Sequence, residues 1–306
     1  MSSIPLLKLN NGLTIPAIGL GCWGGLTLET RAAAKDWILA ALKTGYRHLD
    51  TAYGYGTEES VGKAIRESGI PREEIFVTTK LPYNHPGRVF KSIDESLANA
   101  GLDYFDLYLM HWPQTIAYQE DDDDPKNPDG SLKAVDSPTF NETWADMEQV
   151  LASGKAKSIG ISNFSIKNIE KLLTTAKIIP VINQVELHPY LAQKELLEYC
   201  KGKGIYLTAY TPTGYGTVRG DPTINQLAKK YNASPAQVIL AWHVARGNAA
   251  IPKSQDASRQ KDNLTLITLS PEDVALVSSL DRGERLCNKA DAQGKVNGWT
   301  LEQMGW

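Results

Sequence analysis

Hydrophobic residues follow two alternating patterns along this chain. Short apolar runs are separated by longer stretches in which apolar residues recur every three or four positions, and these two patterns are typical of strands and of amphipathic helices. The short runs predict strands at residues 17–22, 48–51, 75–80, 106–111, 158–162, 182–186, 205–210 and 249–253. The longer stretches predict helices at residues 29–43, 58–68, 86–100, 139–152, 166–173, 193–201 and 235–245.

The regular alternation of strand and helix predicts an α/β fold. Eight strands, each followed by helical sequence, favour a parallel sheet closed into a (β/α)8 TIM barrel. A doubly wound open sheet is the alternative. Barrels of this kind typically form one domain of about 250 residues or more, so we expect a single domain over residues 1–306.

Two terminal segments fall outside this repeating pattern. Asn10, Asn11 and Gly12 separate the short runs 7–9 and 13–15, and because Asn-Gly is a strong signal for a tight turn, we predict an N-terminal β-hairpin. The residues after Leu280 show no clear periodicity, and we expect them to form an ordered C-terminal loop.

Composition and charge argue against several classes of protein. The formal net charge of −3 lacks the basic excess of a protein that binds nucleic acid or an acidic membrane surface. No run reaches the roughly 18 apolar residues of a membrane span, and residues 1–8 contain no long apolar run, so we expect no secretion signal. Cys22, Cys200 and Cys287 lack metal-binding spacing, which predicts reduced thiols in a cytoplasmic protein.

Residues 118–138 interrupt the barrel pattern after the fourth predicted strand. The segment is rich in Asp, Asn and Pro and contains the acidic run 120–124. We interpret it as a solvated loop, because the ligand spacing of a calcium-binding EF-hand is missing.

Polar and aromatic side chains gather where the predicted strands end. They are Trp23, Asp50, Lys80, His111, Ser162, Asn163, Gln184, Tyr210 and Lys253. In a parallel barrel the C-terminal ends of all strands open on one face, and active sites are built there. We therefore expect these side chains to form one ring.

Four residues of this region suit the reduction of a carbonyl group. Tyr55 follows Asp50 in a glycine-rich loop that can turn its side chain over the barrel mouth. A free tyrosine, with a pKa of about 10, is a weak acid at neutral pH, but a nearby Lys80 ammonium held by Asp50 would lower that pKa. His111 would hydrogen-bond the substrate oxygen and orient it. Taken singly, each of these residues also suits a purely structural role.

The chain resembles the aldo-keto reductase superfamily over nearly its whole length. The motifs that carry the resemblance are GLGCW at 19–23, DTAYGY at 50–55, VTTK at 77–80, DLYLMHWP at 106–113, GISNF at 160–164, NQVELHP at 183–189 and IPKS at 251–254. Residues 239–254 look most like fungal glycerol and glyceraldehyde reductases.

The resemblance implies an NADPH-dependent reductase of small carbonyl compounds that acts as a monomer. It implies that Asp50, Tyr55, Lys80 and His111 are the catalytic residues, with Tyr55 as general acid. It assigns the nicotinamide carboxamide to Ser162, Asn163 and Gln184, the nicotinamide ring to Tyr210, the 2′-phosphate to Lys253, Ser254 and Arg259, and the adenine to Asn263. Trp23 and Trp112 would line the substrate pocket.

The segment 211–220 departs from the family pattern. It is short compared with the loop that many members fold over the pyrophosphate, and Thr211 stands where a cofactor-binding serine is usual. We therefore expect a cofactor that is held less fully and exchanges faster.

Several other functions are compatible with parts of the sequence. Residues 19–24 match the GxGxxG pattern of a dinucleotide-binding fold, although a tryptophan within it would crowd a pyrophosphate. A metal-dependent hydrolase would need His48, Asp50, His111 and His188 to meet, and a Schiff-base aldolase would use Lys80. A non-catalytic NADPH-binding redox sensor is the alternative from another class. Neither the substrate nor a role for Cys287 can be inferred.

Overall fold

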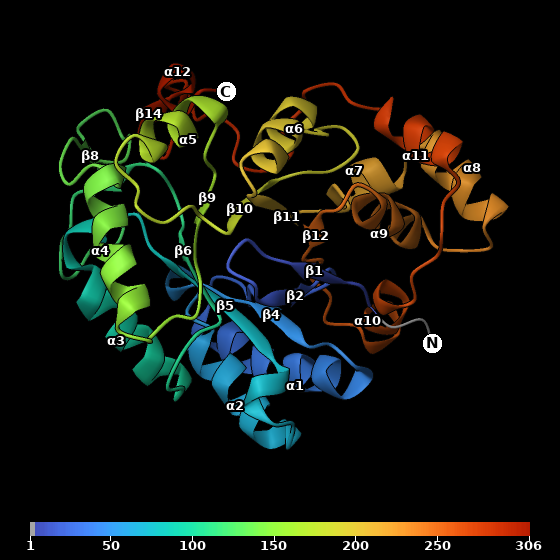
Figure 1. Cartoon of the computed structure of the whole chain (residues 1–306), viewed down its shortest axis with the longest axis horizontal. Helices are drawn as coiled ribbons and strands as arrows, with labels where there is room; N and C mark the ends of the chain where they lie inside the picture. The colour runs from blue at the N-terminus through green and yellow to red at the C-terminus, as the bar shows by residue number, and fades with distance from the viewer. Residues whose placement is uncertain (1–3) are drawn as a thin grey trace.

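The computed structural model describes residues 4–306 and contains a closed barrel of parallel strands (Figure 1). The eight strands are β3 (Leu20–Gly21), β4 (His48–Asp50), β5 (Phe76–Leu81), β6 (Leu107–Met110), β9 (Ile159–Ser162), β10 (Ile182–Glu186), β11 (Tyr206–Tyr210) and β12 (Ala249–Ala250). They lie side by side in chain order. A parallel bridge between Ile18 and Ala250 joins the first strand to the last. The predicted barrel is confirmed, and the doubly wound sheet is wrong.

Helices form an outer ring around these strands (Figure 1). Those that follow the strands are α1 (Leu28–Thr44), α2 (Glu58–Ser68), α3 (Val89–Ala100), α4 (Phe140–Ala152), α5 (Ile166–Leu173), α6 (Lys194–Gly202), α9 (Pro235–Ala245) and α10 (Ala257–Leu264). Local sequence fixes several of their ends. Thr139 and Glu142 form a capping box at the start of α4, and Ser234 and Gln237 form another at the start of α9, which satisfies N–H groups that a helix leaves free.

The predicted helices agree with the structure to within a few residues, but two strands are shorter than expected. The predicted strand 249–253 ends at Ala250, because Pro252 has no N–H group for the ladder. The strand predicted at 17–22 is reduced to Leu20–Gly21. The sequence interpretation also missed the helices α7 (Tyr215–Arg219), α8 (Pro222–Lys230), α10 and α11 (Pro271–Ser278).

The predicted N-terminal hairpin is present and closes one end of the barrel. Strands β1 (Leu6–Lys8) and β2 (Thr14–Pro16) pair antiparallel, and Gly12 has a φ of 87° in the turn between them. Leu9 and Ile15 of the hairpin pack in one cluster with Phe76, Leu107 and Ile182 at the starts of barrel strands. The hairpin therefore covers the N-terminal ends of the strands, opposite the end where the polar side chains were predicted to gather.

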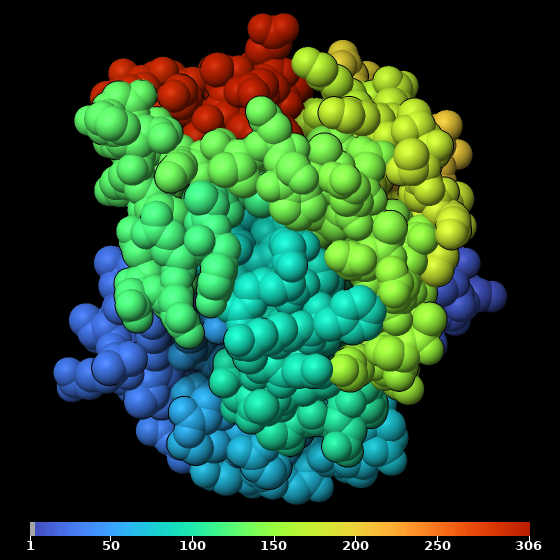
Figure 2. All heavy atoms as spheres, turned by 90° about the vertical axis from the view of Figure 1, so that its left-hand side faces the viewer, coloured from blue at the N-terminus to red at the C-terminus, as the bar shows by residue number. Residues whose placement is uncertain are grey.

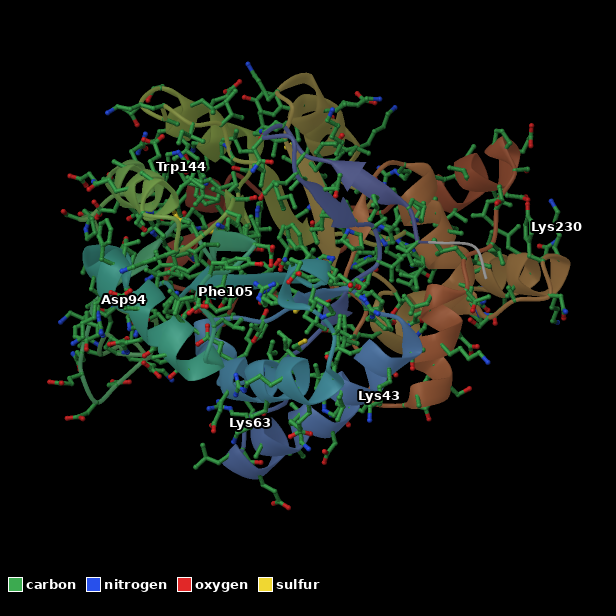
Figure 3. All side chains as sticks on the ribbon, turned by 60° about the horizontal axis from the view of Figure 1, so that its bottom comes forward. Lys43, Lys63, Asp94, Phe105, Trp144 and Lys230 are labelled. Atoms are coloured by element: carbon green, nitrogen blue, oxygen red, sulfur yellow. The ribbon has the colours of Figure 1, made fainter. Side chains whose placement is uncertain are left out.

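The main hydrophobic core lies between the strands and the helices. Phe105 and Trp144 belong to it and are 0% and 1% exposed, whereas Lys43, Lys63 and Lys230 project from the helices into solvent (Figure 3). Close packing also explains Gly160 in β9, since a Cβ atom there would lie 2.7 Å from the Ile182 carbonyl oxygen. The core therefore holds the strand ends in fixed positions.

Two irregular segments meet beside the C-terminal end of the barrel. The acidic segment is bounded by a short antiparallel pair, β7 (Thr115–Ile116) and β8 (Ala134–Val135). The C-terminal tail contains a second pair, β13 (Lys295–Val296) and β14 (Trp299–Thr300), and helix α12 (Leu301–Met304), so the predicted ordered loop also includes short regular elements. In Figure 2 the tail (red) lies against the green segment that follows β6, and Gln293 Nε2 donates to the Asp129 carbonyl at 3.2 Å.

Candidate active site

A buried ion pair lies at the C-terminal end of the barrel. Lys80 in β5 and Asp50 in β4 are 0% and 1% exposed. The Lys80 Nζ donates to Asp50 Oδ1 at 2.6 Å and to the Thr51 carbonyl at 2.7 Å, and the second Asp50 oxygen accepts from Gln184 Nε2 at 2.6 Å. Both oxygens of the carboxylate are thus hydrogen-bonded, which a buried ion pair needs in order to offset its desolvation.

The Tyr55 hydroxyl lies beside this ion pair. Tyr55 ends the 3-10 turn η1 (Tyr53–Tyr55), and Gly56 follows with a φ of 61°, a left-handed conformation that favours glycine. The turn places the Tyr55 hydroxyl 3.5 Å from Lys80 Nζ. The His111 ring meets the Tyr55 ring edge-on, with 5.7 Å between centroids. A phenol, an ammonium, a carboxylate and an imidazole therefore converge at one place.

Burial controls the protonation of these groups. It raises the pKa of Tyr55 above the ordinary value, and the Lys80 ammonium only partly offsets that rise, so the predicted net lowering of this pKa is wrong. Burial alone would lower the pKa of Lys80, but the Asp50 carboxylate and the Tyr55 hydroxyl together outweigh it and the pKa is raised. Burial also holds the pKa of His111 well below the ordinary value. At neutral pH the site therefore contains a neutral phenol, an ammonium and a neutral imidazole, and the ammonium is a poor Schiff-base nucleophile.

Four polar residues predicted to bind a cofactor form a hydrogen-bonded cluster next to this site. Ser162 Oγ donates to the Gln184 carbonyl at 2.8 Å, and the Tyr210 hydroxyl donates to Asn163 Oδ1 at 2.8 Å. Asn163 Nδ2 donates to the His111 carbonyl at 3.0 Å. Asn163 has a φ of 66°, in the left-handed region that Asn occupies more readily than most residues. This conformation turns its amide towards the strand ends.

The C-terminal tail is anchored to this cluster by residues that the sequence interpretation missed. Glu186, the last residue of β10, is fully buried, and its Oε1 accepts from the N–H groups of Leu286 at 2.6 Å and Cys287 at 2.9 Å. Asn288 Nδ2 then donates to the Tyr210 hydroxyl at 2.9 Å. An acidic residue at the end of an apolar strand was the available signal, because a buried carboxylate needs partners.

The two tryptophans predicted to line the substrate pocket differ in exposure. Trp112 is 7% exposed, and its ring stacks on His111 with 6.2 Å between centroids and lies 6.4 Å from the Trp306 ring. Trp23 is 45% exposed, and the Lys253 Nζ lies 5.5 Å from its ring centroid. Trp112 therefore forms a wall beside His111, whereas Trp23 lies on the open rim near Lys253.

A cavity of about 590 Å³ contains the residues predicted to bind a phosphate. Lys253, Ser254, Arg259 and Asn263 line it together with residues of the segment 213–220. An ammonium, a hydroxyl and a guanidinium around one cavity suit a phosphate group, so these residues fit the phosphate of a nucleotide. Thr211, with a φ of 49°, does not line this cavity and lies between Tyr210 and the cavity along the chain.

The residues invoked for a metal site have other partners. His48 Nδ1 lies 3.1 Å from the Pro16 carbonyl oxygen, and His188 Nε2 lies 3.1 Å from Glu186 Oε1. Across residues 4–306 no group of three His, Cys, Asp or Glu side chains is arranged to hold a metal ion. In the same part of the chain, no helix is long and apolar enough to cross a membrane. The first three residues of the segment considered for a secretion signal lie outside the described range.

Comparison with known proteins identifies a set of relatives. The Aldo/keto reductase family matches residues 17–282. The chain is 44% identical to glycerol 2-dehydrogenase (NADP(+)) of Saccharomyces cerevisiae, over 92% of this chain and 93% of that protein. It is 42% identical to D-galacturonate reductase of Hypocrea jecorina, over 94% of each. The solved structure of the aldose reductase from Schistosoma japonicum superimposes with a TM-score of 0.88 at 34% identity, covering 98% of this chain and 99% of that chain.

Proposed function

The chain belongs to the aldo/keto reductase family, and we propose that it reduces small aldehydes and ketones to alcohols with NADPH, using Tyr55 as the proton donor. The observation that carries the proposal is the Tyr55 hydroxyl, 3.5 Å from a buried ammonium that Asp50 holds in place. Two relatives are named for glycerol and for D-galacturonate, which favours small hydroxylated carbonyl compounds as substrates.

Tyr55 and Lys80 together carry out the proton transfer to the substrate. When bound, the nicotinamide supplies the hydride that the carbonyl carbon needs. The raised pKa of Tyr55 keeps the phenol protonated at neutral pH, so it can donate a proton to the carbonyl oxygen. The Lys80 ammonium then stabilises the phenolate that remains. Asp50 keeps this ammonium charged and fixed in position.

His111 orients the substrate. Because burial lowers the pKa of His111, the ring is a neutral imidazole that can donate one hydrogen bond to the carbonyl oxygen without adding charge. Trp112 packs against this ring and limits its movement. The carbonyl oxygen is thereby held where the Tyr55 hydroxyl can reach it.

The cofactor would lie along the ring of strand ends. Ser162, Asn163 and Gln184 carry the amide and hydroxyl groups that suit a carboxamide, and Tyr210 offers a ring for stacking on the nicotinamide. Lys253, Ser254 and Arg259 offer charge and donors to the 2′-phosphate, which favours NADPH over NADH. Asn263 and Thr211 complete the expected contacts.

The test is the loss of NADPH absorbance with glyceraldehyde, dihydroxyacetone, D-galacturonate and an aromatic aldehyde. We expect turnover of at least one compound by the wild type. In Tyr55→Phe we expect a fall in kcat of about 10²- to 10⁴-fold, the usual contribution of a general acid, with unchanged NADPH binding by fluorescence titration.

Two outcomes would contradict the proposal. Tight NADPH binding with no turnover of any carbonyl compound would favour the non-catalytic redox sensor. Turnover that persists in Tyr55→Phe would show that another group donates the proton.

A further inference from the structure

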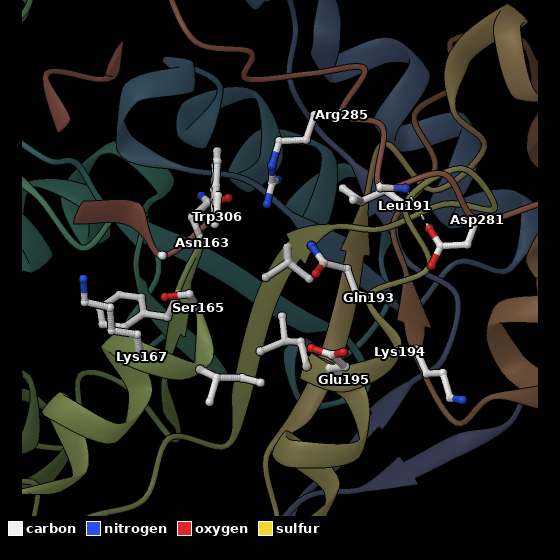
Figure 4. A pocket seen from close by; sticks show the side chains of 16 residues that line it. Asn163, Ser165, Lys167, Leu191, Gln193, Lys194, Glu195, Asp281, Arg285 and Trp306 are labelled. Atoms are coloured by element: carbon white, nitrogen blue, oxygen red, sulfur yellow. Dashed lines mark hydrogen bonds between the residues drawn. The ribbon is translucent and has the colours of Figure 1, made fainter. Parts of the chain in front are cut away.

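A second cavity, of about 540 Å³, lies on the same face of the barrel as the catalytic residues but apart from the Lys253 cavity. Its walls come from the loops after β9 and β10 and from the C-terminal tail (Figure 4). Its apolar lining residues include Val185, Leu191, Leu196 and Trp306. Its size falls in the range of small-molecule sites, roughly 300–1,000 Å³.

Arg285 points from the tail into this cavity (Figure 4). Its side chain is only 18% exposed, and its guanidinium lies 3.3 Å from the centre of the Trp306 ring. The nearest atom of its ion-pair partner Glu186 is 3.7 Å away, which is too long for a hydrogen bond. Within residues 4–306 the guanidinium donates no hydrogen bond, so a planar array of donors faces the cavity.

Glu186 balances the charge of Arg285 without using its donors. Glu186 Oε1 accepts the N–H groups of Leu286 and Cys287, and Oε2 has no hydrogen-bond partner. Burial lowers the pKa of Arg285, and Glu186 and Tyr210 offset this lowering only in part. A ligand carboxylate would add hydrogen-bond acceptors for the guanidinium donors.

The other charged groups around the cavity are exposed, and some already have partners. Lys167 donates to the Glu302 carbonyl at 3.0 Å, and Asp281 accepts from the N–H groups of Ala192 and Gly283. Lys194 and Glu195 lie next to each other at the rim and offset one another in charge. Gln193 adds an amide from the middle of the wall (Figure 4).

We propose that this cavity binds a small aromatic carboxylate. The forked guanidinium of Arg285 matches a carboxylate through two parallel hydrogen bonds. The apolar side chains of Leu191 and Leu196 accommodate a flat ring. The Gln193 amide, whose Nε2 donates to the Glu186 carbonyl at 3.2 Å, meets a hydroxyl substituent on that ring through its oxygen. A free phosphate or a sugar would leave these apolar side chains uncovered.

The proposal is tested by calorimetric titration of 4-hydroxybenzoate into the full chain without cofactor. We expect one saturable site in the wild type and no binding of the neutral 4-hydroxybenzamide. Arg285→Gln should weaken binding of the carboxylate about tenfold or more, since a charge-assisted pair of hydrogen bonds is lost.

Arg282→Gln is the matched control, because it makes the same change three residues away on the same tail. Arg282 lies over the Tyr190 ring and does not line the cavity. We therefore expect the affinity of Arg282→Gln for 4-hydroxybenzoate to remain within about twofold of the wild-type affinity. If Arg285→Gln fails to fold, Arg285→Lys is the second variant. It keeps the positive charge but lacks the paired donors of a guanidinium, so it should still bind 4-hydroxybenzoate several-fold more weakly than wild type.

The test is independent of turnover, so it can fail while the proposed reductase activity holds. A wild type without saturable binding, or an Arg285 variant with unchanged affinity, would overturn the proposal. Binding that disappears in Tyr55→Phe and survives in Arg285→Gln would place the carboxylate at the catalytic site instead and would also overturn it.

Discussion

Two lysines near the ends of barrel strands show that the same type of side chain can serve two different purposes. Lys80 is fully buried and bound to Asp50 at 2.6 Å, and this partner raises its pKa. Lys253 is exposed, forms no ion pair within residues 4–306, and has a pKa lowered by partial burial. A lysine with a fixed internal partner keeps its positive charge next to the reacting groups, whereas a lysine without such a partner remains available to bind an external anion.

Removing Lys80 should have the largest effect. Lys80→Met leaves the Asp50 carboxylate buried and unpaired, so we expect the free energy of unfolding to fall by about 3–5 kcal/mol. Since the positive charge that stabilises the Tyr55 phenolate is also lost, kcat should fall about 10²- to 10⁴-fold. Urea unfolding and single-turnover kinetics measure the two effects separately.

A double variant separates pairing from chemistry. Asp50→Asn combined with Lys80→Met leaves no charge at this buried position, so stability should largely recover while activity stays lost. Lys230→Met is the control. Lys230 projects from the surface (Figure 3) and is paired with Asp273 at 2.7 Å, with a side chain that is 55% exposed, so its removal should leave the free energy of unfolding nearly unchanged. Full activity in the double variant would refute the role assigned to Lys80.

Removing Lys253 should change cofactor affinity and little else. Lys253→Met should weaken NADPH binding about 10- to 100-fold, since a hydrogen bond to a charged phosphate is lost, and should leave NADH binding and the unfolding free energy nearly unchanged. Fluorescence titration with both cofactors measures this. An equal loss for NADH would show that Lys253 holds another part of the cofactor.

The sequence predicted features that depend on local pattern. Helix bounds followed from apolar periodicity, and the barrel followed from the alternation of elements. The ring of polar side chains followed from one topological fact, that parallel strands end on the same face. The contact between Lys80 and Tyr55 could therefore be expected from the sequence alone.

Features that depend on long-range packing were not predictable. Glu186 and Leu286 are separated by 100 positions, and no periodicity connects a carboxylate with a distant backbone N–H group. The direction of the Tyr55 pKa was wrong because the lysine is visible in the sequence and the degree of burial is not. The cavity around Arg285 depends on the path of the tail, which has no repeating pattern.

The smallest expected effect is a pH dependence that distinguishes the two lysines. The pKa of Lys253 is lowered. Its ammonium is present at neutral pH and loses its proton as the pH rises through this lowered pKa. The pKa of Lys80 is raised, so its charge persists over the same range. Between about pH 8 and about pH 10 we therefore expect NADPH affinity to fall a few-fold while NADH affinity stays constant.

Lys253→Arg isolates the cause of this pH effect, because a guanidinium stays charged throughout the range. NADPH affinity in Lys253→Arg should then be independent of pH, although its absolute value will differ since the two side chains meet a phosphate differently. If the variant keeps the wild-type pH dependence, the titrating group is not Lys253. In that case the lowered pKa of Lys253 would have no part in phosphate binding, and the contrast with Lys80 would rest on burial and pairing alone.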